Sequence, residues 1–207
     1  MKHRTIAILV LLALTATGGL SACGSDDNDS PAGNGTDLAF AQQMAAHHQA
    51  AIDMARTAQK QGQSVYIKTL ADDIITSQQG EIAVLKATEG DMADRGVDAG
   101  DLGLSDDLSV MNMDDDALAS ADPFDREFVD MMIPHHQGAI RMARVEIDKG
   151  ASPALKQMAQ DIIDAQSREI NEMNAFRAKT YGSPSPAGGV PSETSDTSSS
   201  MPGMDHG

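Results

Sequence analysis

Apolar residues recur at helical spacing through the middle of the chain, and no segment shows the strict alternation that indicates a β-strand. Residues 37–60 form the first predicted helix, which stops at Gly62. Ser64 is the predicted N-cap of a second helix that ends near Gly90. The apolar face of this second helix consists of Ile67, Leu70, Ala71, Ile74, Ile82 and Leu85. Two amphipathic helices joined by so short a turn are expected to pack as a hairpin.

The hairpin is encoded twice. The motif FxxxMxxHHQxxIxMAR begins at Phe40 and again at Phe128, a displacement of 88 residues. The windows 40–85 and 128–173 align without a gap, so each copy is one structural unit of the same length. Two hairpins with one apolar face each bury those faces best against each other. The sequence therefore predicts an all-α protein, a four-helix bundle built from two duplicated helical hairpins.

The predicted bundle spans residues 37–181, with copy one at 37–90 and copy two at 122–181. In copy two, Asp122-Pro123 and Ser152-Pro153 each place a capping residue before a proline at the first helical position. The acidic linker, residues 91–121, is expected to contain a short helix from Asp115 to Ser120.

Pro134 departs from the repeat, because copy one has Ala46 at this position. Inside a helix, a proline removes a backbone hydrogen bond or bends the axis. We therefore expect Pro134 to kink the third long helix or to remove a backbone hydrogen bond beside His135.

The N-terminus has the pattern of a bacterial lipoprotein signal. Lys2 and Arg4 precede an apolar stretch at 6–14, which is too short to span a membrane as a mature helix. The sequence Leu-Ser-Ala-Cys then ends at Cys23, the single cysteine of the chain, and resembles a lipobox. This pattern predicts a signal peptide at 1–22 and lipidation of Cys23. The protein is therefore expected to be lipid-anchored at the extracytoplasmic face of a bacterial cell membrane, with the lipid as its only membrane contact.

The segments that flank the bundle are rich in Ser, Gly, Asp and Pro. Residues 23–36 are predicted to be a flexible tether, and residues 182–207 a disordered tail. The formal charge of −16 repels nucleic acid and attracts cations. Nucleic-acid binding is therefore excluded.

Four of the six histidines occupy the duplicated motif, as His47, His48, His135 and His136. At about 100° per residue, the two histidines of each pair lie on either side of the centre of the apolar face. Both histidines of a pair therefore point inward. Methionines lie nearby at helical spacing: Met44, Met132 and, in copy two only, Met131.

The second helix of each hairpin carries polar residues within its apolar stripe. Folding the first hairpin about Gly62 brings Gln78 and Glu81 to the level of Met44 and His48. The same reflection about Gly150 brings in Gln166 and Glu169, and we expect these four polar residues to support the metal-binding histidines or to act as alternative ligands. Buried amides and carboxylates are costly unless paired, so this layer predicts a metal site.

Imidazole with thioether and no thiolate favours copper, as Cu(I) or Cu(II), over zinc, calcium or magnesium. The C-terminal Met201, Met204 and His206 repeat these donor types and form a possible auxiliary metal site. For Met54, Met142, Met158 and Met173, packing is the favoured interpretation.

The stretch from Phe124 to Ile140, FDREFVDMMIPHHQGAI, resembles the signature of domain-of-unknown-function family 305. The resemblance extends from Asp37 to about Tyr181. It implies a ferritin-like four-helix bundle, secreted or lipid-anchored, in a family of which some members are linked to copper binding and tolerance. It also implies that the binding residues are His47, His48, His135 and His136 with Met44 and Met132.

Three functions follow from these patterns. The first is a tethered, non-enzymatic protein that buffers copper or exchanges it with a donor or acceptor protein. The second is a ferritin-like di-metal oxidoreductase, which Glu81 and Glu169 favour, although the Glu-x-x-His spacing of di-iron bundles is missing. The third is a structural or partner-binding lipoprotein without metal.

Overall fold

The structure is a computed structural model that describes residues 33–105 and 115–192. In these ranges all regular secondary structure is helical: α1 (Gly35–Gln61), α2 (Val65–Asp94), α4 (Asp115–Ser120), α5 (Phe124–Lys149) and α6 (Pro153–Tyr181). None of these helices is long and apolar enough to cross a membrane. The predicted signal peptide, Cys23 and the Met201, Met204 and His206 group lie outside the described residues.

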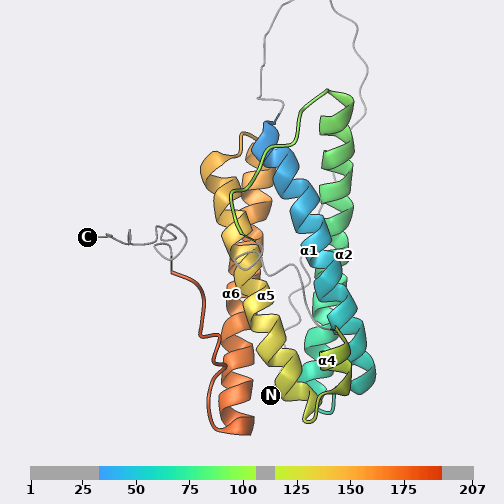
Figure 1. Cartoon of the computed structure of the whole chain (residues 1–207), viewed down its shortest axis with the longest axis vertical. Helices are drawn as coiled ribbons and strands as arrows, with labels where there is room; N and C mark the ends of the chain where they lie inside the picture. Colours follow the sequence, from blue (N-terminus) through green and yellow to red (C-terminus); the bar gives the residue numbers. More distant parts are fainter. Residues whose placement is uncertain (1–32, 106–114, 193–207) are drawn as a thin grey trace, which may run out of the picture.

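The four long helices form a bundle of two hairpins (Figure 1). α1 packs along α2, α5 packs along α6, and the hairpins meet mainly through α1 and α5. The short helix α4 lies at the lower end of the bundle, against α5 and α1. The predicted all-α bundle of two duplicated hairpins is confirmed.

Local capping explains where three of the helices begin. Asn34 caps α1 in a capping box with Asp37. The Ser64 side chain accepts a hydrogen bond from the backbone N–H of Ile67, and the Ser152 side chain accepts one from that of Leu155, as the sequence predicts. Asp122 does not cap α5, because the N-cap is Pro123 and makes no side-chain bond.

One further helix boundary differs from expectation. α2 continues through Gly90 to Asp94, because Met92 on the additional turn is 2 % exposed and packs into the core. α5 continues through Pro134 from Phe124 to Lys149, and because proline has no N–H the helix lacks one backbone hydrogen bond there, which is one of the two outcomes expected.

The described part of the chain continues after α6 as far as residue 192, within the stretch 182–207 that the sequence predicts to be a tail. Residues 183–192, the C-terminal strap, lie against α5 and α6. Gln137 donates hydrogen bonds to the carbonyl oxygens of Ala187 and Gly189, and Arg177 donates to those of Ser183 and Pro184. Side chains of α5 and α6 therefore hold the strap through its backbone carbonyl groups.

The two copies clamp each other by one reciprocal pair of contacts. Asp37 at the start of α1 accepts hydrogen bonds from the backbone N–H groups of Ala151 and Ser152, at 2.9 and 2.8 Å. Asp125, its counterpart in copy two, accepts from those of Gln63 and Ser64, both at 2.8 Å. Each first helix is thereby fixed to the turn of the other hairpin. The hairpins are therefore arranged with approximate two-fold symmetry.

The apolar core is divided into two clusters along the bundle. The lower cluster includes Met54, Ile74, Phe128 and Met132. The upper cluster includes Phe40, Met44, Leu85 and Met142. The residues between the clusters are polar, and they form the candidate site.

Candidate metal-binding site

Four buried histidines lie at mid-height in the bundle, where the two apolar clusters meet. His47 and His48 come from α1, and His135 and His136 come from α5. His135 is 1 % exposed and the other three are 0 % exposed. The inward orientation predicted for both histidines of each pair is present.

Each second helix contributes one carboxylate to this layer. Nε2 of His48 lies 2.6 Å from Oε2 of Glu81, and Nε2 of His136 lies 2.6 Å from Oε2 of Glu169. The glutamate side chains are 26 % and 20 % exposed, whereas the two imidazoles are fully buried. The carboxylates therefore connect the buried rings with solvent.

The inner histidines meet at the centre of the bundle. The ring centroids of His47 and His135 are 3.6 Å apart, with an angle of 35° between the ring planes. The centroids of His47 and His48 are 6.4 Å apart. The layer therefore runs from Glu81 through the four imidazoles to Glu169.

Burial keeps the central ring neutral. Desolvation, followed by the neighbouring His47, His136 and His48, lowers the pKa of His135 well below its ordinary value. Neither ring nitrogen of His135 has a hydrogen-bond partner among the described residues. A neutral imidazole with an available lone pair is the form that coordinates a metal ion.

Gln78 and Gln166 complete the layer. Each is 3 % exposed, and the side-chain oxygen of each lacks a hydrogen-bond partner within the described part of the chain. Such unpartnered acceptors are rare in a folded core and usually have a functional explanation.

The methionines are distributed on both sides of the histidines. Met44 belongs to the upper cluster and Met132 to the lower one, and both are fully buried. Met131 is half-buried against the lower cluster. In the described ranges, no three His, Cys, Asp or Glu side chains are placed to hold one metal ion. In this arrangement an ion would have at most two of these side chains as ligands, and a methionine thioether would supply a third.

A separate surface pocket of about 720 Å³ lies between α5, α6 and residues 102–104. Arg141, Arg144 and Lys149 are among the residues that line it, and no histidine or methionine is. Its chemistry is unrelated to that of the histidine layer.

Sequence reasoning missed an aromatic pair near the layer. The rings of Tyr66 on α2 and Phe176 on α6 stack with centroids 4.7 Å apart. The signal available was a difference between the copies, because the positions equivalent to Tyr66 and Phe176 hold Ala154 and Thr88.

Comparison with known proteins agrees with this architecture. The family model described as Domain of unknown function (DUF305) matches residues 37–177. A structure of CopM in the Cu(I)-bound form is similar with a TM-score of 0.61 and 38% identity, covering 70% of this chain and 98% of that one. CopM in the Cu(II)-bound form gives 0.59 and 36%, with 69% and 96% covered.

Two further proteins match at lower identity or over a shorter stretch. A DUF305 protein from Streptomyces coelicolor shares the fold, with a TM-score of 0.61, 21% identity, and 72% and 96% of the two chains covered. Uncharacterized protein L153 of Acanthamoeba polyphaga mimivirus is 45% identical over 52 residues, which is 25% of this chain and only 34% of that protein.

Proposed function

The chain belongs to the DUF305 family, and from this premise we propose that it binds copper outside the cytoplasm and buffers it or passes it on. The observation that carries the proposal is the row of four buried imidazoles across the centre of the bundle. The similarity to copper-bound CopM supports the choice of metal.

The donor set fits a soft or borderline cation. His47, His48, His135 and His136 would supply nitrogen ligands, with Met44 and Met132 as thioether donors for Cu(I) and Met131 as a more exposed one. Glu81 and Glu169 each contact one imidazole and would fix the orientation of its ring, as carboxylates do beside metal-bound histidines. Copper is the cargo in this proposal, and no catalytic step is assigned.

The lipid anchor, the surface charge and the C-terminal Met/His group would bring copper to the protein. Cys23 would carry the lipid anchor, and the net charge of −16 would raise the cation concentration near the surface. Met201, Met204 and His206 would form an auxiliary capture site.

A di-metal oxidoreductase is the second candidate, because each hairpin contributes one His–Glu pair to the layer. It requires both carboxylates as direct ligands, whereas a His/Met copper site requires only their hydrogen bonds. Substitution of the glutamates therefore separates the two functions.

The experiment is equilibrium binding and thermal unfolding of the purified protein with Cu(I), Cu(II), Zn(II) and Fe(II). A variant with alanine at His47, His48, His135 and His136 is compared with the surface control Gln49→Ala. We expect copper-selective stabilisation of about 2–3 kcal/mol at a hundredfold excess over Kd, lost only in the quadruple variant. A preference for iron, or a melting temperature that ignores every metal, would overturn the copper proposal.

A further inference from the structure

The two outer helices face each other along a line that we call the α2/α6 seam. α2 and α6 are not among the closely packed helix pairs of the described residues. Glu169 on α6 lies close enough to α2 that its charge, after burial, contributes to raising the pKa of Asp73 on α2. By the two-fold arrangement, Glu81 on α2 faces α6 along the same seam. The seam is therefore the side on which both His–Glu pairs approach solvent.

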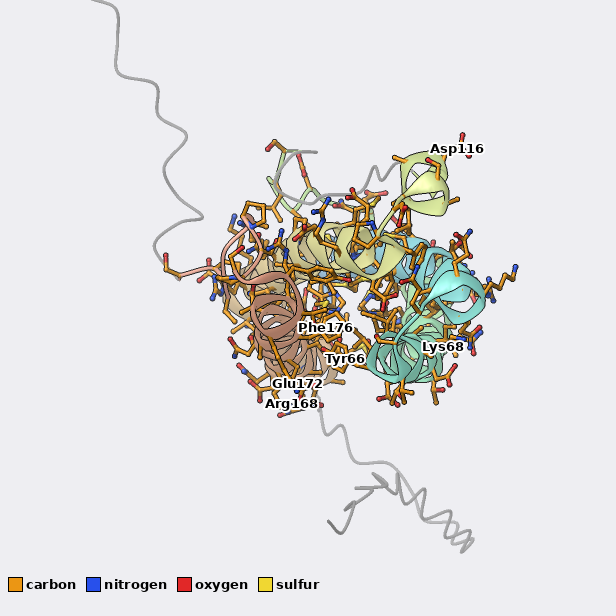
Figure 2. The ribbon with its side chains drawn as sticks, turned by 90° about the horizontal axis from the view of Figure 1, so that it is seen from below. Tyr66, Lys68, Asp116, Arg168, Glu172 and Phe176 are labelled. Carbon is orange, nitrogen blue, oxygen red and sulfur yellow. The ribbon has the colours of Figure 1, made fainter. Side chains whose placement is uncertain are left out.

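One half of the seam is closed by aromatic side chains. Tyr66 from the first turn of α2 stacks on Phe176 from the last turns of α6, with 24° between the ring planes. Figure 2 shows the two residues side by side between α2 and α6, with Glu172 and Arg168 on the outer side of α6. The hydroxyl of Tyr66 is buried, and the pKa of Tyr66 is raised by burial and then by Glu172 and Glu169. The aromatic pair therefore lies on the half of the seam that leads to Glu169 and His136.

The other half lacks these rings. The counterparts of Tyr66 and Phe176 are Ala154, which is exposed, and Thr88, which is half-buried. Val84, the counterpart of Glu172, is 49 % exposed. The side chain of Glu81 is 26 % exposed, against 20 % for Glu169. A methyl group and a short hydroxyl side chain cannot cover the seam as two stacked rings do.

We infer that ions enter and leave the histidine layer through the Glu81–His48 half of the seam, and that Tyr66 and Phe176 close the Glu169–His136 half. This inference rests on the proposed copper binding. A hydrated cation would first meet the partly exposed carboxylate of Glu81 and then the imidazole 2.6 Å behind it. An exchange route of this kind sets the rates of uptake and release and leaves the equilibrium affinity unchanged.

The test gives each half of the seam the residues that the other half has at the equivalent positions. The closing variant carries Thr88→Phe with Ala154→Tyr, and the opening variant carries Tyr66→Ala with Phe176→Thr. Both are loaded with Cu(I), and transfer to a colorimetric Cu(I) chelator is followed by stopped-flow absorbance. The purified full chain is the reference, and circular dichroism checks folding. We expect the closing variant to release copper about tenfold more slowly at unchanged Kd, and the opening variant to release it no more slowly than the reference.

Several outcomes overturn the inference. An unchanged release rate in the closing variant shows that ions do not use the Glu81 half. Faster release in the opening variant together with an unchanged rate in the closing variant assigns the route to the Glu169 half. If the closing variant does not fold, Thr88→Phe alone, at a half-buried site, must slow release by at least a factor of about two. Absence of Cu(I) binding by the reference protein itself is a different result, because it removes the proposed function and the inference with it.

Discussion

The imidazole of His47 lies against that of His135, 3.6 Å between ring centroids, although the two residues belong to different hairpins. They occupy the same position in the two copies, so the contact lies on the approximate two-fold axis of the bundle. The centre of the candidate site is therefore made by docking one hairpin on the other, and neither hairpin contains it alone.

Replacing both central rings separates stability from binding. The double variant His47→Leu with His135→Leu keeps a similar volume and removes the unpartnered buried nitrogens of His135. We expect the metal-free variant to be as stable as the parent or more stable, by roughly 1–3 kcal/mol, because an unsatisfied polar group is removed. Copper-induced stabilisation should disappear. Differential scanning calorimetry with and without Cu(I) measures both, and a variant that still gains stability from copper would place the site elsewhere.

The two carboxylates differ in role from the histidines. Glu81→Gln and Glu169→Gln retain a polar group beside His48 and His136 but remove its charge. We expect each to weaken copper binding about 10–100-fold without abolishing it, as for carboxylates that orient metal-bound histidines. Competition titration gives the affinities. Glu172→Gln, one turn from Glu169 and exposed, is the matched control. Complete loss of binding in either variant would favour the di-metal site.

The reciprocal clamps should dominate the docking of the hairpins. Asp125 is 3 % exposed and holds two backbone N–H groups of the opposite turn. Asp125→Ala leaves these donors unpaired, and we expect a loss of about 2–4 kcal/mol in the free energy of unfolding. The exposed Asp53→Ala should change it by no more than about 0.5 kcal/mol. Urea denaturation compares them, and equal effects of the two substitutions would contradict the clamp.

Glu146 gives the fold a pH dependence between the ordinary pKa of a glutamate side chain and about pH 8. It is 0 % exposed, and burial, together with the adjacent Asp37, raises its pKa to about 8. The pKa of Asp37 lies below its ordinary value, because hydrogen bonds from the backbone of Ala151, Ser152 and Asn34 outweigh the effect of burial. Glu146 therefore holds the proton of the pair, and folding keeps a proton that the unfolded chain has lost.

The direction in which stability changes with pH follows from that proton. The stabilising contribution is complete below the unfolded pKa of Glu146 and is lost as the pH rises to about 8. Glu146→Gln keeps the hydrogen-bonding shape without ionising. Relative to the parent, we expect this variant to gain roughly 2.5 kcal/mol between about pH 6 and about pH 9. Urea unfolding at both pH values measures the difference, and parallel pH profiles for the two proteins would contradict the assignment.

The sequence was sufficient for the helices of each hairpin and for how they pair within it, although not for the end of α2 or the cap of α5. Helical periodicity is strong over both copies, so the helices and their turns at Gly62 and Gly150 were predicted. The contact between His48 and Glu81 followed from reflecting α1 onto α2 about Gly62. Helical geometry is regular enough for this arithmetic to locate partners within one turn.

Contacts between the hairpins could not be obtained in this way. The contact of His47 with His135 depends on the register of α1 against α5, which no periodicity specifies. Asp37 and Asp125 look like ordinary residues of a first helical turn, although their partners are more than 60 positions away in the chain. The strap has the composition of a disordered tail, and its anchors Gln137 and Arg177 lie on other elements.

The reciprocal clamps of Asp37 and Asp125 also bear on the history of the chain. A single copy carries both halves of that contact, the carboxylate and the turn that it grips, so two separate copies could assemble the same layer as a symmetric homodimer. Joining them in one polypeptide releases each position from serving both sides of the axis. The two copies differ at such equivalent positions: Ala58 in copy one corresponds to Glu146 in copy two, and Tyr66 corresponds to Ala154. A fused chain of this kind can give the two sides of one interface different residues.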